Sequence, residues 1–347
     1  MDNLPQQSNP AASPDPPSPR RRRRVLTWAV TLLALLAQLA GGVAGWHYGV
    51  ARYQQPGPLP EQRAVVVPRG SEAQVAEALR DAGVIDDPLA FRIASFVTRR
   101  DGPIRAAELA FPAHASLREV LQVLRTARPV QYRLTIAEGL TSAQIAVLLE
   151  RAPALTGPTP VPEEGTLMAE TYLYERGTTR EALLARARAA MGQALAQAWA
   201  ERADGLPLAS PHEMLTLASI VERETARPEE RPMVAAVFLN RLQQGMRLQS
   251  DPTVIYAVSG GQGALERPLS RADLDWPNPY NTYRVTGLPP GPIAAPGLAA
   301  LRAVAHPAPV DDLYFVADGN GGHAFARTLE QHNRNVARLR ALQAEPR

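Results

Sequence analysis

The hydrophobic positions along the chain form three successive patterns. Val25 to Trp46 is an unbroken run of 22 residues without a charged side chain, and this length suffices for a helix to span hydrocarbon. From Val65 to about Glu150, a short apolar strand, a turn and an amphipathic helix recur three times. Beyond a Pro-rich loop at 153–162, helical periodicity dominates. The patterns predict an α+β fold: an N-terminal transmembrane helix, a small α+β domain and a larger mixed α/β domain.

The changes of pattern also give the expected domain boundaries. Ser71, Ser116 and Thr141 stand where the three helices of the small domain need N-caps. In the larger domain we expect helices at 179–202, 210–227, 232–244, 297–305 and after 328, a buried strand at 312–317 and a long polar loop region at 246–295. The expected parts are a disordered cytoplasmic tail at 1–24, a transmembrane helix at 25–48, a linker at 49–64, the small domain at 65–150 and the larger domain at 151–345.

One helix of the larger domain carries an acid on its apolar stripe. Ser210, Pro211 and Glu213 mark the helix start as a capping box with proline at the first position, and Pro228 disfavours helix at the residue before it. Glu224 falls about 20° from Leu217 around the helix, within the stripe of apolar side chains. A carboxyl among apolar neighbours stays protonated near neutral pH and suits a general acid. An ordinary glutamate whose head reaches water is the alternative interpretation.

The composition narrows the possible chemistry. The chain has no cysteine and no lysine, which excludes disulfides, thiolate nucleophiles, cysteine metal sites and lysine Schiff-base chemistry. Its six histidines are scattered, without an HExxH motif, so we expect no metal site. Ser219 lacks the GxSxG context of a serine hydrolase. We expect neither a cofactor nor a nucleic-acid partner.

The net charge of +3 is largely local. Arg20 to Arg24 directly precede the uncharged run, and Trp28 and Trp46 lie near its two ends. Under the positive-inside rule, the N-terminus stays in the cytoplasm and the rest of the chain is translocated. Two alternatives remain: a signal peptide cleaved near Ala40–Gly45, for which the apolar run is long, and an Arg-rich DNA-binding tail.

The polar region at 246–295 combines aromatic side chains with amides and carboxylates. Tyr256, Trp276, Tyr280 and Tyr283 lie among Asn, Gln and Asp residues. Pyranose rings require such surfaces, because their CH faces stack on aromatic rings and their hydroxyls form hydrogen bonds. The region is therefore interpreted as a carbohydrate site, with a surface loop packed by its own side chains as the alternative.

Several long motifs resemble the MltG (YceG-like) family of endolytic murein transglycosylases. They cover about residues 135–335 and read LASIVERETA at 217, EERPMVAAVFLNRL at 229, GMRLQSDPTVIYAV at 245, YNTYRVTGLPPGPIAAPG at 280 and LYFVADGNGGHAF at 313. The N-terminal anchor fits the layout of the family, in which the small domain is LysM-like. One departure is Ala169, where the family usually has proline, before Glu170 in the acidic place.

The resemblance implies a single-pass inner-membrane lyase with a periplasmic catalytic domain. Its catalytic glutamate would be Glu224, the second acid of the E-x-E-T motif. It would cleave the MurNAc–GlcNAc β-1,4 bond in nascent glycan strands, leave 1,6-anhydro-MurNAc ends and terminate glycan elongation. The implied partners are peptidoglycan strands and peptidoglycan synthases. We expect the following residues to bind substrate or support catalysis: Glu222, Asn240, Gln249, Asp251, Thr253, Asn281 and Tyr283.

Two other functions stay open at this stage. A muramidase-type hydrolase would use Asp251 or Glu222 with water, because hydrolysis needs a second carboxylate. A membrane-anchored glycan-binding protein would have no catalytic activity at all.

Overall fold

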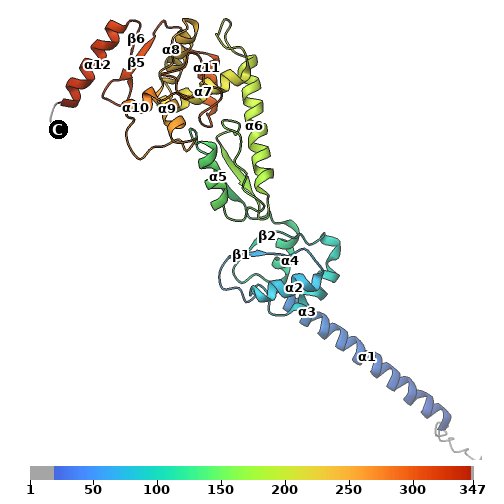
Figure 1. Ribbon diagram of the computed structural model, residues 1–347. Coiled ribbons are helices and arrows are strands. Elements are labelled where there is room, and N and C mark those ends of the chain that lie inside the picture. Colours follow the sequence, from blue (N-terminus) through green and yellow to red (C-terminus); the bar gives the residue numbers. More distant parts are fainter. Residues whose placement is uncertain (1–18, 345–347) are drawn as a thin grey trace, which may run out of the picture. The chain divides into compact units, whose positions relative to one another are not determined.

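The computed structural model describes residues 19–344, which fall into two compact units that meet at Pro129 and Val130. Both units combine helices with small antiparallel sheets, so the mixed α/β prediction is confirmed. Figure 1 shows the elements of each unit. Each sheet among the described residues has two strands, and most of the buried apolar surface therefore comes from helices.

The first unit begins with the long helix α1 (Pro19–Gln54). Strands β1 (Arg63–Val66) and β2 (Glu108–Phe111) pair antiparallel. The helices α2 (Glu72–Asp81), α3 (Pro88–Val97) and α4 (Leu117–Thr126) surround them, with a 3₁₀ turn at Arg99–Asp101. Their inward side chains form one core around Leu79, Phe91 and Leu124. Ser71 and Ser116 cap α2 and α4 through complete capping boxes, as predicted.

Helix α1 is longer than the sequence pattern suggested. It begins at Pro19 and continues to Gln54, so it includes the end of the expected tail and the start of the expected linker. Arginine is a good helix former, proline suits the first helical turn, and nothing in between breaks the helix. Residues 1–18, most of the expected tail, lie outside the described residues. Within the described chain, Leu26–Gln54 is the single helix long and apolar enough to cross a membrane.

The second unit begins earlier than expected, before β3 rather than after α5. Strand β3 (Tyr132–Thr135) pairs antiparallel with β4 (Thr171–Tyr174). Helix α5 (Ser142–Arg151), capped by Thr141, shares a core with β4 and the first half of α6 (Arg180–Ala200). The expected boundary at 150 fails because the sequence repeat ends at α5, whereas the pairing partner of β3 lies beyond the Pro-rich loop.

The remaining elements of the second unit form a helical cluster and a hairpin. The helices are α7 (Pro211–Glu224), α8 (Arg231–Gln243), α9 (Asp251–Val258), α10 (Arg271–Asp275), α11 (Leu298–Ala305) and α12 (Leu329–Ala344). Strands β5 (Tyr314–Ala317) and β6 (His323–Ala326) form an antiparallel hairpin, and β5, where a buried strand was expected, is only half-buried. The 246–295 region is less irregular than expected, because it contains α9 and α10.

Helix α7 is the centre of this unit. It packs against α6, α8, α9 and α11, which lie around it in Figure 1, and all its residues from Met214 to Glu222 are buried. Ser210 caps its N-terminus as predicted. It ends at Glu224 rather than Arg227, because Thr225 turns extended and accepts the Arg227 amide in a hydrogen bond of 3.1 Å. Glu224 is therefore the last residue of a helix whose preceding turns are buried in the core.

Candidate active site

The C-terminus of α7 carries a carboxyl with a shifted proton affinity. Burial, helped by the nearby Asp251 charge, raises the pKa of Glu224 to about 7. A hydrogen bond from Ser250 and the Arg241 cation act in the opposite direction. The residue keeps part of its surface accessible, while its carboxyl lies among buried neighbours. Glu224 can therefore both hold and release a proton near neutral pH.

Ser250 fixes one oxygen of this carboxyl. Its hydroxyl donates a short hydrogen bond to Glu224 Oε1. The Ser250 backbone is held in turn, because its amide donates to Thr282 Oγ1 at 2.9 Å and its carbonyl accepts from Thr253 Oγ1 at 2.7 Å. Within residues 19–344, no hydrogen bond reaches Glu224 Oε2. That oxygen is free to exchange a proton with a bound molecule.

A buried arginine lies close enough to Glu224 to affect its pKa. Arg241 of α8 donates to the carbonyls of Leu313 at 2.6 Å and Leu248 at 2.7 Å. Its guanidinium also lies 5.3 Å from the centre of the Tyr314 ring, a cation–π distance. Burial lowers the pKa of Arg241, yet a guanidinium remains charged in proteins. Arg241 therefore joins the loop before α9 to the start of β5 and stabilises the ionised form of Glu224.

Asp251 and Tyr283 form the more open side of the site. The Tyr283 hydroxyl donates to Asp251 Oδ1 at 2.6 Å. Burial and the Asp251 carboxylate raise the pKa of Tyr283, so its hydroxyl remains a donor. Asp251 is exposed and is the first residue of α9. The pair presents a carboxylate and an aromatic ring beside Glu224, which suits a sugar hydroxyl and a ring face.

Two further predicted residues shape the backbone beside Glu224. Gln249 has a left-handed backbone with φ 53°, and its amide donates to the Thr282 carbonyl at 3.2 Å. Thr253 is fully buried and its hydroxyl lies 2.8 Å from that of Thr282. Together these contacts orient Ser250, which lies between them in the chain.

Glu222 points away from this group and serves another purpose. Residues two apart on a helix face different sides. Its carboxyl is buried, accepts from Arg231 at 2.8 Å and from the Gly297 amide at 2.9 Å. Both oxygens are thus engaged, and burial raises the pKa of Glu222 against the lowering effects of Gly297 and Arg231. Glu222 ties α7 to α8 and to the start of α11.

Asn240 and Asn281 also use their side chains to hold backbone. The Asn240 amide donates to the carbonyls of Val310 at 2.9 Å and Asp312 at 3.1 Å. The fully buried Asn281 donates to three carbonyls, at 3.2 Å for Asp273, 3.0 Å for Leu274 and 2.8 Å for Trp276. Neither amide group is directed at Glu224, so these two predicted residues support the site through the loops that they fix.

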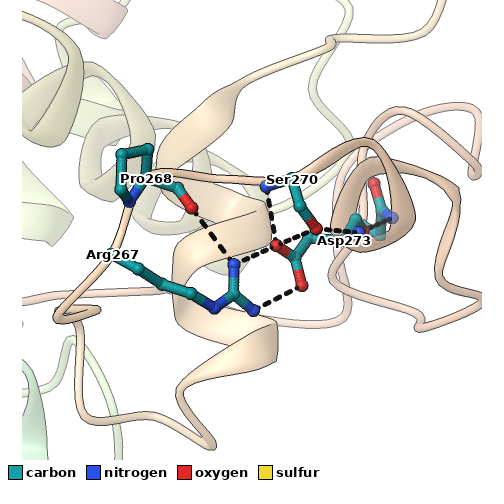
Figure 2. A network of polar contacts seen from close by, with 5 residues as sticks. Arg267, Pro268, Ser270 and Asp273 are labelled. Carbon is teal, nitrogen blue, oxygen red and sulfur yellow. Dashed lines mark hydrogen bonds and ion pairs between the residues drawn. The ribbon is translucent and has the colours of Figure 1, made fainter.

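A compact polar network stabilises the loop that leads to Tyr283. Figure 2 shows Arg267 facing the carboxylate of Asp273, with nitrogen–oxygen distances of 2.5 and 2.9 Å. Ser270 completes a capping box with Asp273 at the start of α10. The Arg267 guanidinium holds the pKa of Asp273 well below its usual range. The charges of Arg267 and Asp273 are paired with each other, so this network stabilises the loop and does not supply a proton.

The aromatic residues of the 246–295 region divide between core and surface. The Tyr256 and Tyr280 rings lie 5.0 Å apart and pack on the helical core, and the Tyr256 hydroxyl donates to Glu164 at 3.2 Å. Burial raises the pKa of Glu164. Trp276 is 43% exposed. Of the four aromatic residues expected to contact a sugar, Trp276 and Tyr283 are thus the ones left for stacking.

Sequence reasoning missed Ser250 and Arg241. Ser250 precedes the DPT motif and Arg241 follows Asn240, but neither has a signature of its own. An arginine within an apolar helical segment was the available signal, since a buried cation needs a fixed set of acceptors. The described residues include no group of three potential metal ligands.

The sequence has clear relatives. It matches the profile of the YceG-like family over residues 65–338. An endolytic murein transglycosylase of Bacillus subtilis (strain 168) is 46% identical over 125 residues, covering 36% of this chain and 34% of that protein. One of Streptococcus pneumoniae serotype 2 is 31% identical over 368 residues, covering 90% of this chain and 65% of that protein. The chain thus matches about a third and just under two thirds of the lengths of these relatives.

A solved structure is also similar. The crystal structure of a YceG-like protein from Listeria monocytogenes shares 29% sequence identity. It matches with a TM-score of 0.49 over 79% of this chain and 99% of that chain.

Proposed function

The chain belongs to the YceG-like family, and from this premise we propose that it is a peptidoglycan lytic transglycosylase, a lyase that cuts glycan strands internally. Two curated relatives bear the name endolytic murein transglycosylase. The observation that carries the proposal is Glu224, a carboxyl with a pKa of about 7 and one oxygen without a hydrogen-bond partner among residues 19–344. Cleavage of a glycosidic bond needs such a proton donor.

The proposed reaction uses Glu224 twice. Protonated Glu224 gives its proton to the glycosidic oxygen of the MurNAc–GlcNAc β-1,4 bond as the bond to the MurNAc C1 breaks. The C6 hydroxyl of the same MurNAc then attacks C1, and its proton passes to the Glu224 carboxylate. The products are a 1,6-anhydro-MurNAc end and a free GlcNAc hydroxyl, and no water is consumed. Arg241 and Ser250 stabilise the intermediate carboxylate.

Asp251 is the residue that a hydrolytic mechanism would use as its second carboxylate. It is close enough to Glu224 to raise the pKa of that carboxyl, and a pair of carboxyls roughly 5 to 9.5 Å apart is the arrangement used by hydrolases. In the transglycosylase proposal, Asp251 instead holds the sugar together with Tyr283. The fate of water separates the two reactions.

The test is digestion of purified sacculi by the full-length protein in heavy-oxygen water, followed by mass spectrometry. We expect unlabelled 1,6-anhydro-MurNAc ends, with internal cuts predominating over release of terminal disaccharides. Glu224→Gln should abolish cleavage, whereas Glu229→Gln, an exposed glutamate on the following turn, should cut at the wild-type rate. Labelled reducing MurNAc ends would instead establish a hydrolase. An inactive wild type would favour a glycan-binding protein.

The cellular setting is part of the proposal. Helix α1 would anchor the protein in the inner membrane, with the N-terminus in the cytoplasm and the second unit in the periplasm. The first unit would be a LysM-like glycan-binding domain. Cuts in nascent strands would terminate glycan elongation beside peptidoglycan synthases. A reporter fused after residue 347 should then be active in the periplasm, and cytoplasmic activity would contradict this orientation.

A further inference from the structure

Helix α3 exposes an apolar face that nothing in its unit covers. Its inner side packs Phe91 into the core. On its outer side Leu89, Ile93 and Val97 are 63%, 56% and 64% exposed, and they follow one another at every fourth residue, which aligns them on one face. Phe96 beside them is 62% exposed. The helix therefore presents a cluster of large apolar side chains on the side away from the core, and such an exposed cluster marks an interaction surface.

This outer face continues onto the helix that ends beside it. Figure 1 shows α3 next to the C-terminal end of α1, and the two helices are in contact. Between them lies a groove of about 670 Å³ lined by Trp46, Tyr53, Leu89, Ile93 and Val97, among other residues. The apolar surface of α1, which is exposed along its whole span, is thus continuous with the outer face of α3.

The position of α3 along α1 sets its depth in a membrane. A hydrocarbon layer about 30 Å thick takes about 20 helical residues, which from Leu26 end at Gly45. Trp46 to Tyr53 then rise about 10 Å further and cross the headgroup layer. Trp46 and Tyr48 are both 70% exposed, as expected of aromatic residues at that boundary. The groove lies along this stretch, so α3 lies at the level of the headgroups.

The basic residues on α3 and just after it suit the same location. Arg92, Arg99 and Arg100 are exposed on the helix and directly after it, and the Arg99 guanidinium lies 4.3 Å from the centre of the Phe96 ring. Long basic side chains beside an apolar face reach the phosphates of anionic lipids while their stems stay in the interface. This arrangement fits the surface of a phospholipid bilayer.

We propose that α3 is an interfacial helix whose outer face, with Leu89, Ile93, Phe96 and Val97, inserts among the lipids of the bilayer that α1 spans. This proposal rests on the membrane anchoring of α1 described above. The occupants of the groove are then the lipids next to α1, whose upper acyl segments meet the outer face at the boundary between headgroups and hydrocarbon. The first unit is attached to the membrane at two places, a span and a surface helix, so that it cannot swing freely on a tether.

The absence of cysteine makes a direct test available. Single cysteines are introduced at Ile93, Leu36 or Val66 of the full-length protein and labelled with a polarity-sensitive fluorophore. The protein is reconstituted into vesicles of phosphatidylcholine and phosphatidylglycerol, with or without lipids that carry a doxyl quencher. We expect a blue-shifted, quenched signal at Ile93 and Leu36. Val66 is a matched control, because it is 50% exposed on β1 and not part of the groove, and its signal should stay unquenched.

The three positions separate the possible failures. A quenched Leu36 with an Ile93 signal like that of Val66 would overturn the interfacial helix while keeping the anchor. An unquenched Leu36 would overturn the anchor and the proposal together. Disulfide formation between unlabelled Ile93→Cys copies, together with a labelled Ile93→Cys that the lipids do not quench, would assign the groove to a second copy. As a further check, Ile93→Asp should remove quenching of a probe at Phe96→Cys but leave that at Leu36, and persistent quenching at Phe96→Cys would contradict insertion.

Discussion

At the scale of single residues, the site depends on how one carboxyl holds its proton. Burial raises the pKa of Glu224, while Ser250 and Arg241 limit the rise. A pKa near the working pH serves both halves of an acid–base cycle. The chain therefore has to combine a hydrophobic surrounding for the neutral form with a donor and a cation for the charged form.

The raised pKa of Glu224 predicts a pH-dependent stability. From its ordinary value of 4.5 up to about 7, the folded protein keeps a proton that the unfolded chain releases, so the free energy of unfolding falls as the pH rises. Glu224→Gln cannot titrate and so lacks this loss. Its free energy of unfolding relative to wild type should therefore rise by about 1 to 2 kcal/mol from pH 4 to pH 8, a figure reduced because the side chain is partly accessible to solvent. Denaturant titrations at both pH values measure it.

Glu222→Gln is the comparison variant that separates the roles of the two acids of α7. It weakens a buried ion pair with Arg231 and should lower the free energy of unfolding by about 1 to 3 kcal/mol. The folded variant should still cleave glycan strands. Because burial raises the pKa of Glu222 as well, this variant should also gain stability relative to wild type as the pH rises. The two acids are separated by cleavage instead, and a loss of cleavage in Glu222→Gln as complete as that in Glu224→Gln would contradict their separate roles.

Ser250→Ala should change the pH dependence of the reaction. The Ser250 hydrogen bond favours the carboxylate, so its removal raises the pKa of Glu224. The alkaline limb of the rate profile, which reports loss of the acid form, should move to higher pH, and the maximal rate should fall because the carboxyl is less firmly oriented. Ser259→Ala, a serine on the far end of α9, should leave the profile unchanged. A profile that does not move for Ser250→Ala would remove Ser250 from the site.

The sequence led to Glu224 and not to its partners for a physical reason. The apolar stripe of α7 is a local pattern, readable from side chains three and four residues apart. Ser250 meets Glu224 only because Thr282 and Arg241 hold its loop against the end of α7. Asn240 and Asn281 are polar residues in the right motifs, yet they bond to backbone carbonyls. Polarity alone does not distinguish a ligand contact from a structural one.

At the scale of elements, caps were predictable and tertiary pairings were not. Ser71, Ser116, Thr141 and Ser210 cap their helices as the sequence indicated, since capping depends on residues within one turn. The pairing of β3 with β4 across the Pro-rich loop has no such local signal. The helix α9 was hidden because its first residues, Asp251, Pro252 and Thr253, have the composition of a turn, although proline is common in a first helical turn.

Gly165 tests how tightly the loop before β4 packs. Its φ is +74°, and an added Cβ would lie 2.5 Å from Pro292 Cβ. Gly165→Ala should therefore cost both backbone strain and a clash with a rigid ring, about 3 kcal/mol or more. Gly177 has φ +84° but open space around it, so Gly177→Ala should cost only about 1 to 2 kcal/mol. Equal losses in thermal unfolding would show that Pro292 moves aside.

At the scale of the whole molecule, the two units have separate cores. Phe91 belongs to the core of the first unit and Phe238 to the helical core of the second. No core cluster of the described residues includes members of both units.

Separate cores predict separate unfolding transitions. Phe91→Ala and Phe238→Ala should each remove about 3 to 5 kcal/mol from one unit, and calorimetry in detergent micelles should show a different transition lowered in each variant. Only the Phe238→Ala transition should be accompanied by loss of cleavage at temperatures above it. A single transition lowered equally by both variants would mean that the units unfold cooperatively.

The backbone at Gln249 lowers the stability of the fold while it restricts the loop that carries Ser250. A residue with a Cβ at φ 53° costs about 1 kcal/mol or more relative to glycine. Glycine would relieve that cost but leave the loop before Ser250 more ways to move. Gln249→Gly should therefore raise the unfolding temperature, because glycine relieves the backbone strain. It should also lower the rate of cleavage, because the loop that positions Ser250 becomes more mobile. The strained backbone at Gln249 would then lower the stability of the fold while keeping Ser250 in place beside Glu224.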